Sequence, residues 1–166
     1  MPHQSAAAVT GHGFDAHAFC EGRPLILGGV PIEHDRGLAG HSDADVLTHA
    51  ICDAILGAVC AGDIGRHFPD NDPRYKGAVS VELLRQVVRI AEERGGRILH
   101  VDATVIAQRP KLAPYMERMH ARLKGAMPPD TLLNIKATTT EGMGFTGREE
   151  GIAALATATV ALSGGV

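Results

Sequence analysis

Two residues near the start of the chain, Asp15 and His17, carry side chains that can bind a metal ion. They stand two positions apart in GFDAHAF at 13–19, a stretch with the pattern of an extended strand, so both side chains project from one face. His49 follows in a segment with helical spacing. If that helix packs beside the strand, an Asp-His-His set forms, of the kind that binds zinc and leaves one coordination position open. The spacing by itself also fits the ordinary polar face of a strand.

A histidine that binds zinc normally donates its second ring N–H to a nearby acceptor. Asp45 and Asp53 stand one helical turn before and after His49, on the same face of the expected helix. We therefore expect Asp45 or Asp53 to accept a hydrogen bond from His49.

Strands and helices must position these side chains. Apolar residues at 46–59 recur every three or four positions, which predicts a helix with Ser42 or Asp43 as its N-cap. The segment 150–162 is rich in alanine, but the alternation of its Ile, Thr and Val residues favours a strand. The other patterns predict a strand at 9–19, a hairpin at 23–32, helices at 80–94 and 113–125, and strands at 98–108 and 132–140.

These elements predict one α/β (α+β) domain over residues 9–166, with a mixed or largely antiparallel sheet and helices packed on one face, behind an N-terminal tail at 1–8. Of the 166 residues, 45% are hydrophobic but only 4% aromatic, which suits close packing of helices on a sheet. A net charge of −3 argues against a nucleic-acid surface, and no apolar run is long enough to cross a membrane.

Cysteine usage and the first residues bear on the cellular compartment. Three cysteines without a CxxC pair fit neither a disulfide framework nor a thiolate zinc site. The first residues lack the basic region and long apolar core of a signal peptide. We therefore expect a cytoplasmic protein.

Five blocks of sequence carry a more specific pattern: GHGFDAHAF, LAGHSDADVLTHAICDAILGA, GDIGRHFPDNDPRYKGA, IAQRPKLAPY and NIKATTTEGMGFTGREEGIA. With these blocks in order, the chain resembles the 2-C-methyl-D-erythritol 2,4-cyclodiphosphate synthase family from Gly11 to about Leu162. The resemblance implies a phosphorus–oxygen lyase of the non-mevalonate isoprenoid pathway. Its substrate is 4-diphosphocytidyl-2-C-methyl-D-erythritol 2-phosphate. The 2-phosphate attacks the β-phosphorus, CMP leaves, and 2-C-methyl-D-erythritol 2,4-cyclodiphosphate forms.

The resemblance also implies two divalent metal sites. It makes Asp15, His17 and His49 the ligands of a zinc ion that holds the diphosphate. It makes Glu141 a ligand of a magnesium or manganese ion that bridges the substrate phosphates, in keeping with the preference of hard cations for carboxylate and phosphate oxygens.

Roles for other residues follow from the same resemblance. The expected catalytic residues are His41 and Thr139, which stabilise the transition state, and Asp63, which binds a substrate hydroxyl. Contacts to the phosphates and the methylerythritol part are expected from Asp15, His17, His41, Ser42, Asp63, Ile64, Gly65, Phe68, Asp70, Asp72 and Glu141. Contacts to the cytosine and CMP part are expected from Ala107, Pro110, Lys111, Leu112, Ala137, Thr138 and Thr139, with Phe145 and Arg148 as further substrate contacts.

The resemblance further implies a homotrimer with active sites between neighbouring subunits. Arg148 and Glu150 are then expected to line an axial channel that holds an isoprenoid diphosphate. Two other functions stay open on the residues alone. One is a metal-dependent phosphohydrolase that uses the same Asp-His-His set to activate water. The other is a non-catalytic zinc-binding or nucleotide-binding module.

Overall fold

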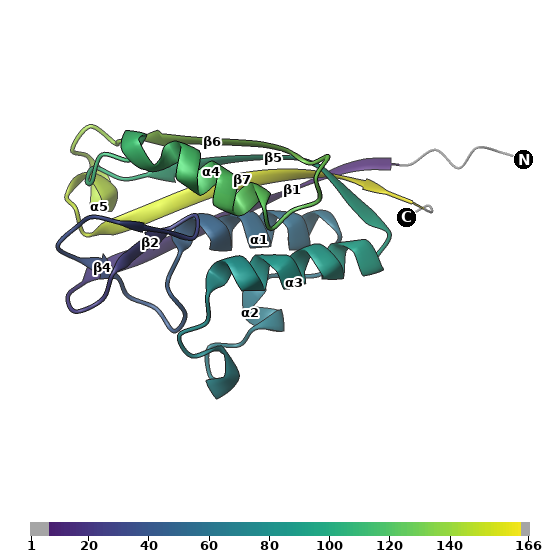
Figure 1. The fold of residues 1–166 in the computed structure, drawn as a ribbon, viewed down its shortest axis with the longest axis horizontal. Coiled ribbons are helices and arrows are strands. Elements are labelled where there is room, and N and C mark those ends of the chain that lie inside the picture. Colours follow the sequence, from purple (N-terminus) through teal and green to yellow (C-terminus); the bar gives the residue numbers. More distant parts are fainter. Residues whose placement is uncertain (1–6, 164–166) are drawn as a thin grey trace, which may run out of the picture.

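A five-stranded mixed sheet forms the framework of the molecule, and a separate two-stranded hairpin accompanies it (Figure 1). The structure is a computed structural model that describes residues 7–163. The main sheet has the order β4-β1-β7-β5-β6. Its strands are β1 (Ala7–Cys20), β4 (Gly37–Leu38), β5 (Gly96–Ile106), β6 (Leu132–Thr138) and β7 (Gly151–Leu162), and the hairpin consists of β2 (Leu25–Leu27) and β3 (Val30–Ile32).

The pairing of the strands confirms the expected mixed sheet. β7 lies between β1 and β5 and pairs antiparallel with both, whereas β5 and β6 are parallel. The segment 150–162 is therefore a central strand, as its alternation predicts, and its small buried alanines, such as Ala154 and Ala158, leave room for a helix on that face.

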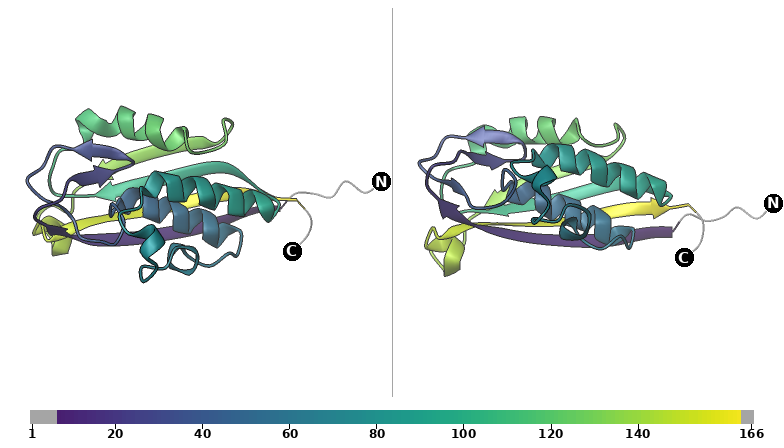
Figure 2. Two further views of the ribbon diagram at one scale, coloured as in Figure 1. Left: turned by 60° about the horizontal axis from the view of Figure 1, so that its bottom comes forward. Right: turned by 90° about the horizontal axis from the view of Figure 1, so that it is seen from below.

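Three longer helices match the predicted ones: α1 (Val46–Ala58), α3 (Ser80–Glu93) and α4 (Met116–Lys124), the last continuing the 3-10 turn η2 (Ala113–Tyr115). α1 packs on β1 and β7, α3 packs on α1, and α4 lies against β6 (Figure 2). The sequence pattern did not reveal the short helices α2 (Ile64–His67) and α5 (Gly144–Gly147), the turn η1 (Pro73–Tyr75) or the two-residue strand β4.

The first turn of α1 differs from the prediction. Its N-cap is Asp45, whose side chain accepts the backbone N–H of Thr48 at 3.1 Å, and not Ser42 or Asp43. Ser42 and Asp43 belong instead to the loop before the helix, where Ser42 Oγ accepts from the Ala44 N–H. A carboxylate nearer the helix satisfies the free N–H groups of the first turn directly.

Two glycines of β1 bring α1 unusually near the sheet. A Cβ atom at Gly13 would overlap the carbonyl oxygen of Ala50, and one at Gly11 would overlap that of Ala54. Only glycine therefore allows this approach of helix and strand backbones. The short distance brings Ala50 and Ala54 of α1 against β1 and sets His49 beside Asp15.

The opposite face of the sheet carries no helix in residues 7–163 and exposes large apolar side chains. Phe14 on β1 is opposite Leu155 on β7, and they are 55% and 45% exposed. Leu132 on β6 is 69% exposed. Exposed large apolar side chains of this kind are typical of a surface that another protein chain covers.

Strand β1 begins at Ala7, two residues before the predicted start of the first strand. Residues 1–6 of the predicted N-terminal tail lie outside the described part of the chain. None of the helices within residues 7–163 has both the length and the apolar character needed to cross a bilayer.

Candidate metal and substrate site

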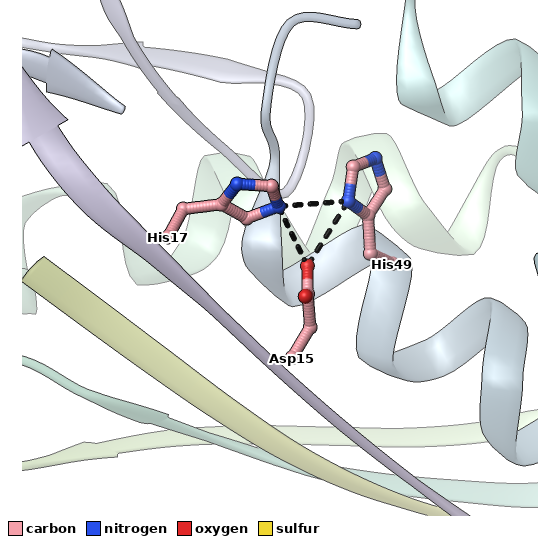
Figure 3. A group of neighbouring side chains, drawn as sticks. All are labelled: Asp15, His17 and His49. Atoms are coloured by element: carbon pink, nitrogen blue, oxygen red, sulfur yellow. Dashed lines mark hydrogen bonds and ion pairs between the residues drawn. The ribbon is translucent and has the colours of Figure 1, made fainter. Parts of the chain in front are cut away.

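The strand β1 and the helix α1 bring Asp15, His17 and His49 together on the helix-covered side of the sheet (Figure 3). Asp15 Oδ2 lies 2.9 Å from His17 Nε2 and 3.0 Å from His49 Nδ1. The two ring nitrogens lie 3.3 Å apart. Three ligand atoms thus converge on one point, as the spacing predicted, and the group could hold a metal ion.

Each histidine has its outer ring nitrogen engaged elsewhere. His17 Nδ1 lies 2.6 Å from the carbonyl oxygen of Ala39, an acceptor that requires the proton on Nδ1. His49 Nε2 lies 2.8 Å from Ser80 Oγ, the first residue of α3. In both rings the inner nitrogen would offer its lone pair to a cation that replaces the hydrogen bond to Asp15, and outer ring nitrogens bound to other groups are the usual arrangement of metal-binding histidines.

The prediction that Asp45 or Asp53 accepts a hydrogen bond from His49 is wrong. Asp45 is fully buried, and its carboxylate accepts from the backbone N–H groups of Gly28 and Gly29 and from both the N–H and the hydroxyl of Thr48. Asp53 accepts from the N–H of Ile64 at 2.7 Å. One helical turn places these carboxylates near His49 along the helix, but stronger local donors hold both of them away from its ring.

The electrostatics of the group keep Asp15 ionised. Burial raises the pKa of the Asp15 carboxyl, but hydrogen bonds and charge from His17 and His49 outweigh burial and hold that pKa well below its usual range. Burial likewise lowers the pKa of His17, and the hydrogen bond and charge of Asp15 outweigh it, so the pKa of His17 is raised. A carboxylate kept ionised between two imidazoles is a suitable donor set for zinc and related divalent ions.

A cavity of about 520 Å³ opens beside this group. The loop before α1 contributes His41 and Ser42 to its wall, and His41 Nε2 lies 3.3 Å from the carbonyl oxygen of Asp72. The structure thus gathers many of the residues expected to contact the phosphates and the methylerythritol part: Asp15, His17, His41, Ser42, Ile64, Gly65, Phe68 and Asp70.

The other two acidic residues expected here occupy capping positions. Asp63 is the N-cap of α2 and accepts the N–H of Arg66 at 2.9 Å. Asp72 is the N-cap of η1 and pairs with the guanidinium of Arg74 at 2.6 Å. Both adjoin the cavity along the chain without lining it.

A second cavity, of about 400 Å³, lies at the ends of β5 and β6 and shares no lining residue with the first. Its wall contains every residue expected around the cytosine and CMP part, together with Glu141: Ala107, Pro110, Lys111, Leu112, Ala137, Thr138 and Thr139. Thr139 Oγ1 donates to Glu141 at 3.3 Å. Thr139 and Glu141 are therefore not gathered with His41 within one chain.

The last two expected substrate contacts, Phe145 and Arg148, lie between β6 and β7. Phe145 lines a third cavity, of about 180 Å³, with Glu150 and residues of β1. Arg148 donates to Glu150 at 2.8 Å. This ion pair is exposed in the single chain.

Sequence reasoning missed several residues that shape the first cavity. Arg23 donates to the carbonyl oxygens of Gly40 and Ser42, each at 2.5 Å, and so fixes the loop before α1. Ser80 supports His49 from another helix. No local spacing links these residues to the metal group, because each reaches it across a tertiary contact. Gly40, Pro69, Asn71 and Leu83 also line the cavity.

An α/β domain with an Asp-His-His group in the wall of a cavity is a candidate metal-dependent enzyme. The chain belongs to the YgbB family, whose family model matches residues 8–161. It is 60% identical over 147 residues to the 2-C-methyl-D-erythritol 2,4-cyclodiphosphate synthase of Syntrophobacter fumaroxidans, an alignment that covers 88% of this chain and 92% of that one. It is 58% identical to the enzyme of the same name from Lysinibacillus sphaericus, over 89% of this chain and 94% of the other.

Solved structures agree with this assignment. The bifunctional IspDF of Campylobacter jejuni superposes with a TM-score of 0.90 at 44% identity, covering 96% of this chain and 43% of that longer chain. The IspF of Plasmodium falciparum, solved in complex with CDP, superposes with a TM-score of 0.80 at 29% identity, over 96% of this chain and 99% of the other.

Proposed function

We propose that this protein converts 4-diphosphocytidyl-2-C-methyl-D-erythritol 2-phosphate to 2-C-methyl-D-erythritol 2,4-cyclodiphosphate and CMP, as a phosphorus–oxygen lyase of isoprenoid biosynthesis. An oxygen of the 2-phosphate forms a bond to the β-phosphorus. The bond from that phosphorus to the bridging oxygen breaks, and this oxygen leaves with CMP. The convergence of Asp15, His17 and His49 beside a cavity of about 520 Å³, in a chain of this family, is the observation that supports the proposal.

The reaction needs positioning and charge neutralisation more than a strong base, because the attacking phosphate is already an anion. Asp15, His17 and His49 would hold a divalent cation, zinc by their ligand type, which supplies Lewis-acid neutralisation of the diphosphate. His41 and Ser42 line the same cavity and would donate to phosphate oxygens. Ile64, Gly65, Phe68 and Asp70, with Asp63 and Asp72 beside them, form the wall for the methylerythritol part.

The second cavity is the proposed cytidine site. Backbone groups around Ala107 and Ala137 would read the cytosine edge, and Lys111 would meet a phosphate. Glu141, beside Thr139, would hold a magnesium or manganese ion on the phosphates. Hard cations of this type favour one carboxylate with phosphate oxygens and water.

The two cavities become one active site if neighbouring chains assemble. We propose a homotrimer in which the metal cavity of one chain faces the cytidine cavity of the next. The exposed apolar side chains of the open sheet face, Phe14, Leu155 and Leu132, support such an assembly, since a closed symmetric oligomer would bury them. In that trimer, Arg148 and Glu150 would line the axial channel expected to hold an isoprenoid diphosphate.

Phosphorus NMR tests the proposed reaction. Purified protein is mixed with the diphosphocytidyl methylerythritol phosphate, zinc and magnesium. Two coupled signals from a cyclic diphosphate, with one CMP for each, support the synthase. Orthophosphate or a linear product instead indicates the phosphohydrolase, and no turnover by zinc-loaded protein indicates a binding module.

A further inference from the structure

We propose that Asp43 and Ser80 are positioning residues that fix the tautomer and the ring orientation of His49. Through them, Nδ1 of His49 presents its lone pair to the metal ion. The inference rests on the proposed function of Asp15, His17 and His49 as a metal site, and it adds two residues that act through His49.

The direction of each hydrogen bond follows from the chemistry of the groups. An ionised carboxylate can only accept, so the hydroxyl of Ser80 must donate to Asp43 Oδ1. The Ser80 hydroxyl has one proton, which it donates to Asp43. Its oxygen can therefore only accept a hydrogen bond from His49 Nε2, which lies 2.8 Å away. With a cation held by Asp15 and His17, His49 would therefore keep its one proton on Nε2, and Nδ1 would present its lone pair to that cation.

Asp43 is held rigidly enough to set this direction. Its Oδ2 accepts the backbone N–H of Ser80 at 3.0 Å, and its Oδ1 also accepts the N–H of Asp45 at 3.2 Å. Its own N–H donates to the carbonyl oxygen of Ala78. Val79, the N-cap of α3, makes no side-chain cap bond, so Asp43 caps that helix from a neighbouring segment.

Ser80 is fully buried, so water cannot readily take its place as the acceptor. Ser42 Oγ is a second neighbour of His49 Nε2, at the longer distance of 3.2 Å, and it accepts from the N–H of Ala44. Ser42 also faces the substrate cavity, where a phosphate would compete for its hydroxyl. Ser80 is therefore the acceptor that stays with His49 throughout a catalytic cycle.

Two variants of the full-length protein test the inference, Ser80→Ala and Asp43→Asn. The first removes the acceptor. The second keeps the shape of the side chain but replaces one carboxylate oxygen with an NH₂ donor, which either reverses the bond to Ser80 or removes the cap of α3. Thr131→Val is the matched control, because Thr131 is also a buried residue whose hydroxyl donates, at 3.0 Å, to the Ile98 carbonyl oxygen far from the metal group.

Two readouts need no substrate. Zinc affinity, by competition with a chromophoric chelator, is expected to fall about 10- to 100-fold in both variants and to stay within twofold in the control, as when other partners of metal-binding histidines are removed. Nitrogen-15 NMR of the zinc-loaded natural protein is expected to show the His49 proton on Nε2. In zinc-free Ser80→Ala protein, the share of His49 with its proton on Nδ1, where Asp15 accepts it, should be larger than in zinc-free natural protein.

The outcomes separate this inference from the proposed reaction. An Nδ1–H tautomer of His49 in the zinc-loaded natural protein overturns the inference, and so does Ser80→Ala protein with the same tautomer populations and the same zinc affinity as the natural protein. Failure to form the cyclic diphosphate, with tautomer and zinc affinity as expected, counts against the proposed reaction alone.

Discussion

His49 Nδ1 lies 3.0 Å from Asp15 Oδ2, although 34 residues separate them in the chain. The contact exists because Gly13, two residues before Asp15, leaves space for the backbone of α1 at Ala50. Close packing of a helix on a glycine-containing strand thus creates the three-residue group. The metal group and the packing of β1 against α1 are therefore expected to change together when either is altered.

Replacing the metal ligands should remove the bound ion. Asp15→Ala and His49→Ala are each expected to weaken zinc binding more than about 100-fold, since changes to the outer partners of ligands already cost 10- to 100-fold. Metal analysis after dialysis measures the zinc content. His120→Gln is the control, because His120 bonds only to the Leu133 carbonyl oxygen and lies away from the group. Full zinc occupancy in either ligand variant would contradict the metal assignment.

Gly13→Ala should lower stability by about 1–3 kcal/mol, the usual cost of forcing extra atoms into a packed interior. It should also weaken zinc binding, because α1 must move away from β1. Urea unfolding and chelator competition measure the two effects. Gly57→Ala, in α1, is the matched control. A Cβ atom at Gly57 would meet neighbouring atoms only at 3.8 Å and beyond, so a gain in stability of up to about 1 kcal/mol is expected.

Asp45→Ala should destabilise the fold by about 3 kcal/mol, because it leaves buried N–H groups of Gly28, Gly29 and Thr48 without an acceptor. Urea unfolding is again the measurement. The hydrogen bond from His49 Nε2 to Ser80 is retained, so zinc affinity in protein that remains folded should be nearly unchanged. A large loss of affinity with little loss of stability would restore Asp45 as a partner of His49.

The ionisation of Asp53 should make the stability of the fold depend on pH. Burial raises the pKa of its carboxyl, opposed by the N–H of Ile64 and assisted by the charges of Asp63 and Asp15. A raised pKa in the folded state means that ionisation costs stability, so its contribution is present at low pH and lost as the pH rises above 3.8 and through the raised pKa. Asp53→Asn removes this loss.

The stability of Asp53→Asn relative to the natural protein should therefore increase between pH 3.5 and neutrality, roughly the range over which a raised carboxyl pKa is crossed. Chemical unfolding at several pH values follows this difference. A difference that stays constant with pH, or decreases, would show that Asp53 ionises at least as easily in the fold as in the unfolded chain.

Charge on the open sheet face should prevent the proposed trimer. Phe14→Asp and Leu155→Asp place a carboxylate where two exposed apolar side chains face each other across β1 and β7. Light scattering should give three times the mass of one chain for the natural protein and one chain for the variants. Activity should fall with assembly, and a fully active monomer would contradict the shared active site.

Much of the fold was predictable because its signals are local. The period of the apolar residues indicated α1, α3 and α4, and the alternation at 150–162 indicated β7. Short elements such as α2 and β4 were missed, since a few residues do not establish a period. The site residues were predicted from the resemblance that five sequence blocks carry to a known family. The structure gathers most of these residues into two separate cavities.

The sequence by itself determined that Asp15 and His17 share a face, because the two-residue period of a strand is a property of the backbone. Only the tertiary structure decided the partners of these residues. Ser80 supports His49 from 31 residues away, and Asp45, which is nearer in the chain, caps α1 instead. A hydrogen bond goes to the group that packing brings into line, and that packing depends on how close Gly11 and Gly13 allow α1 to come.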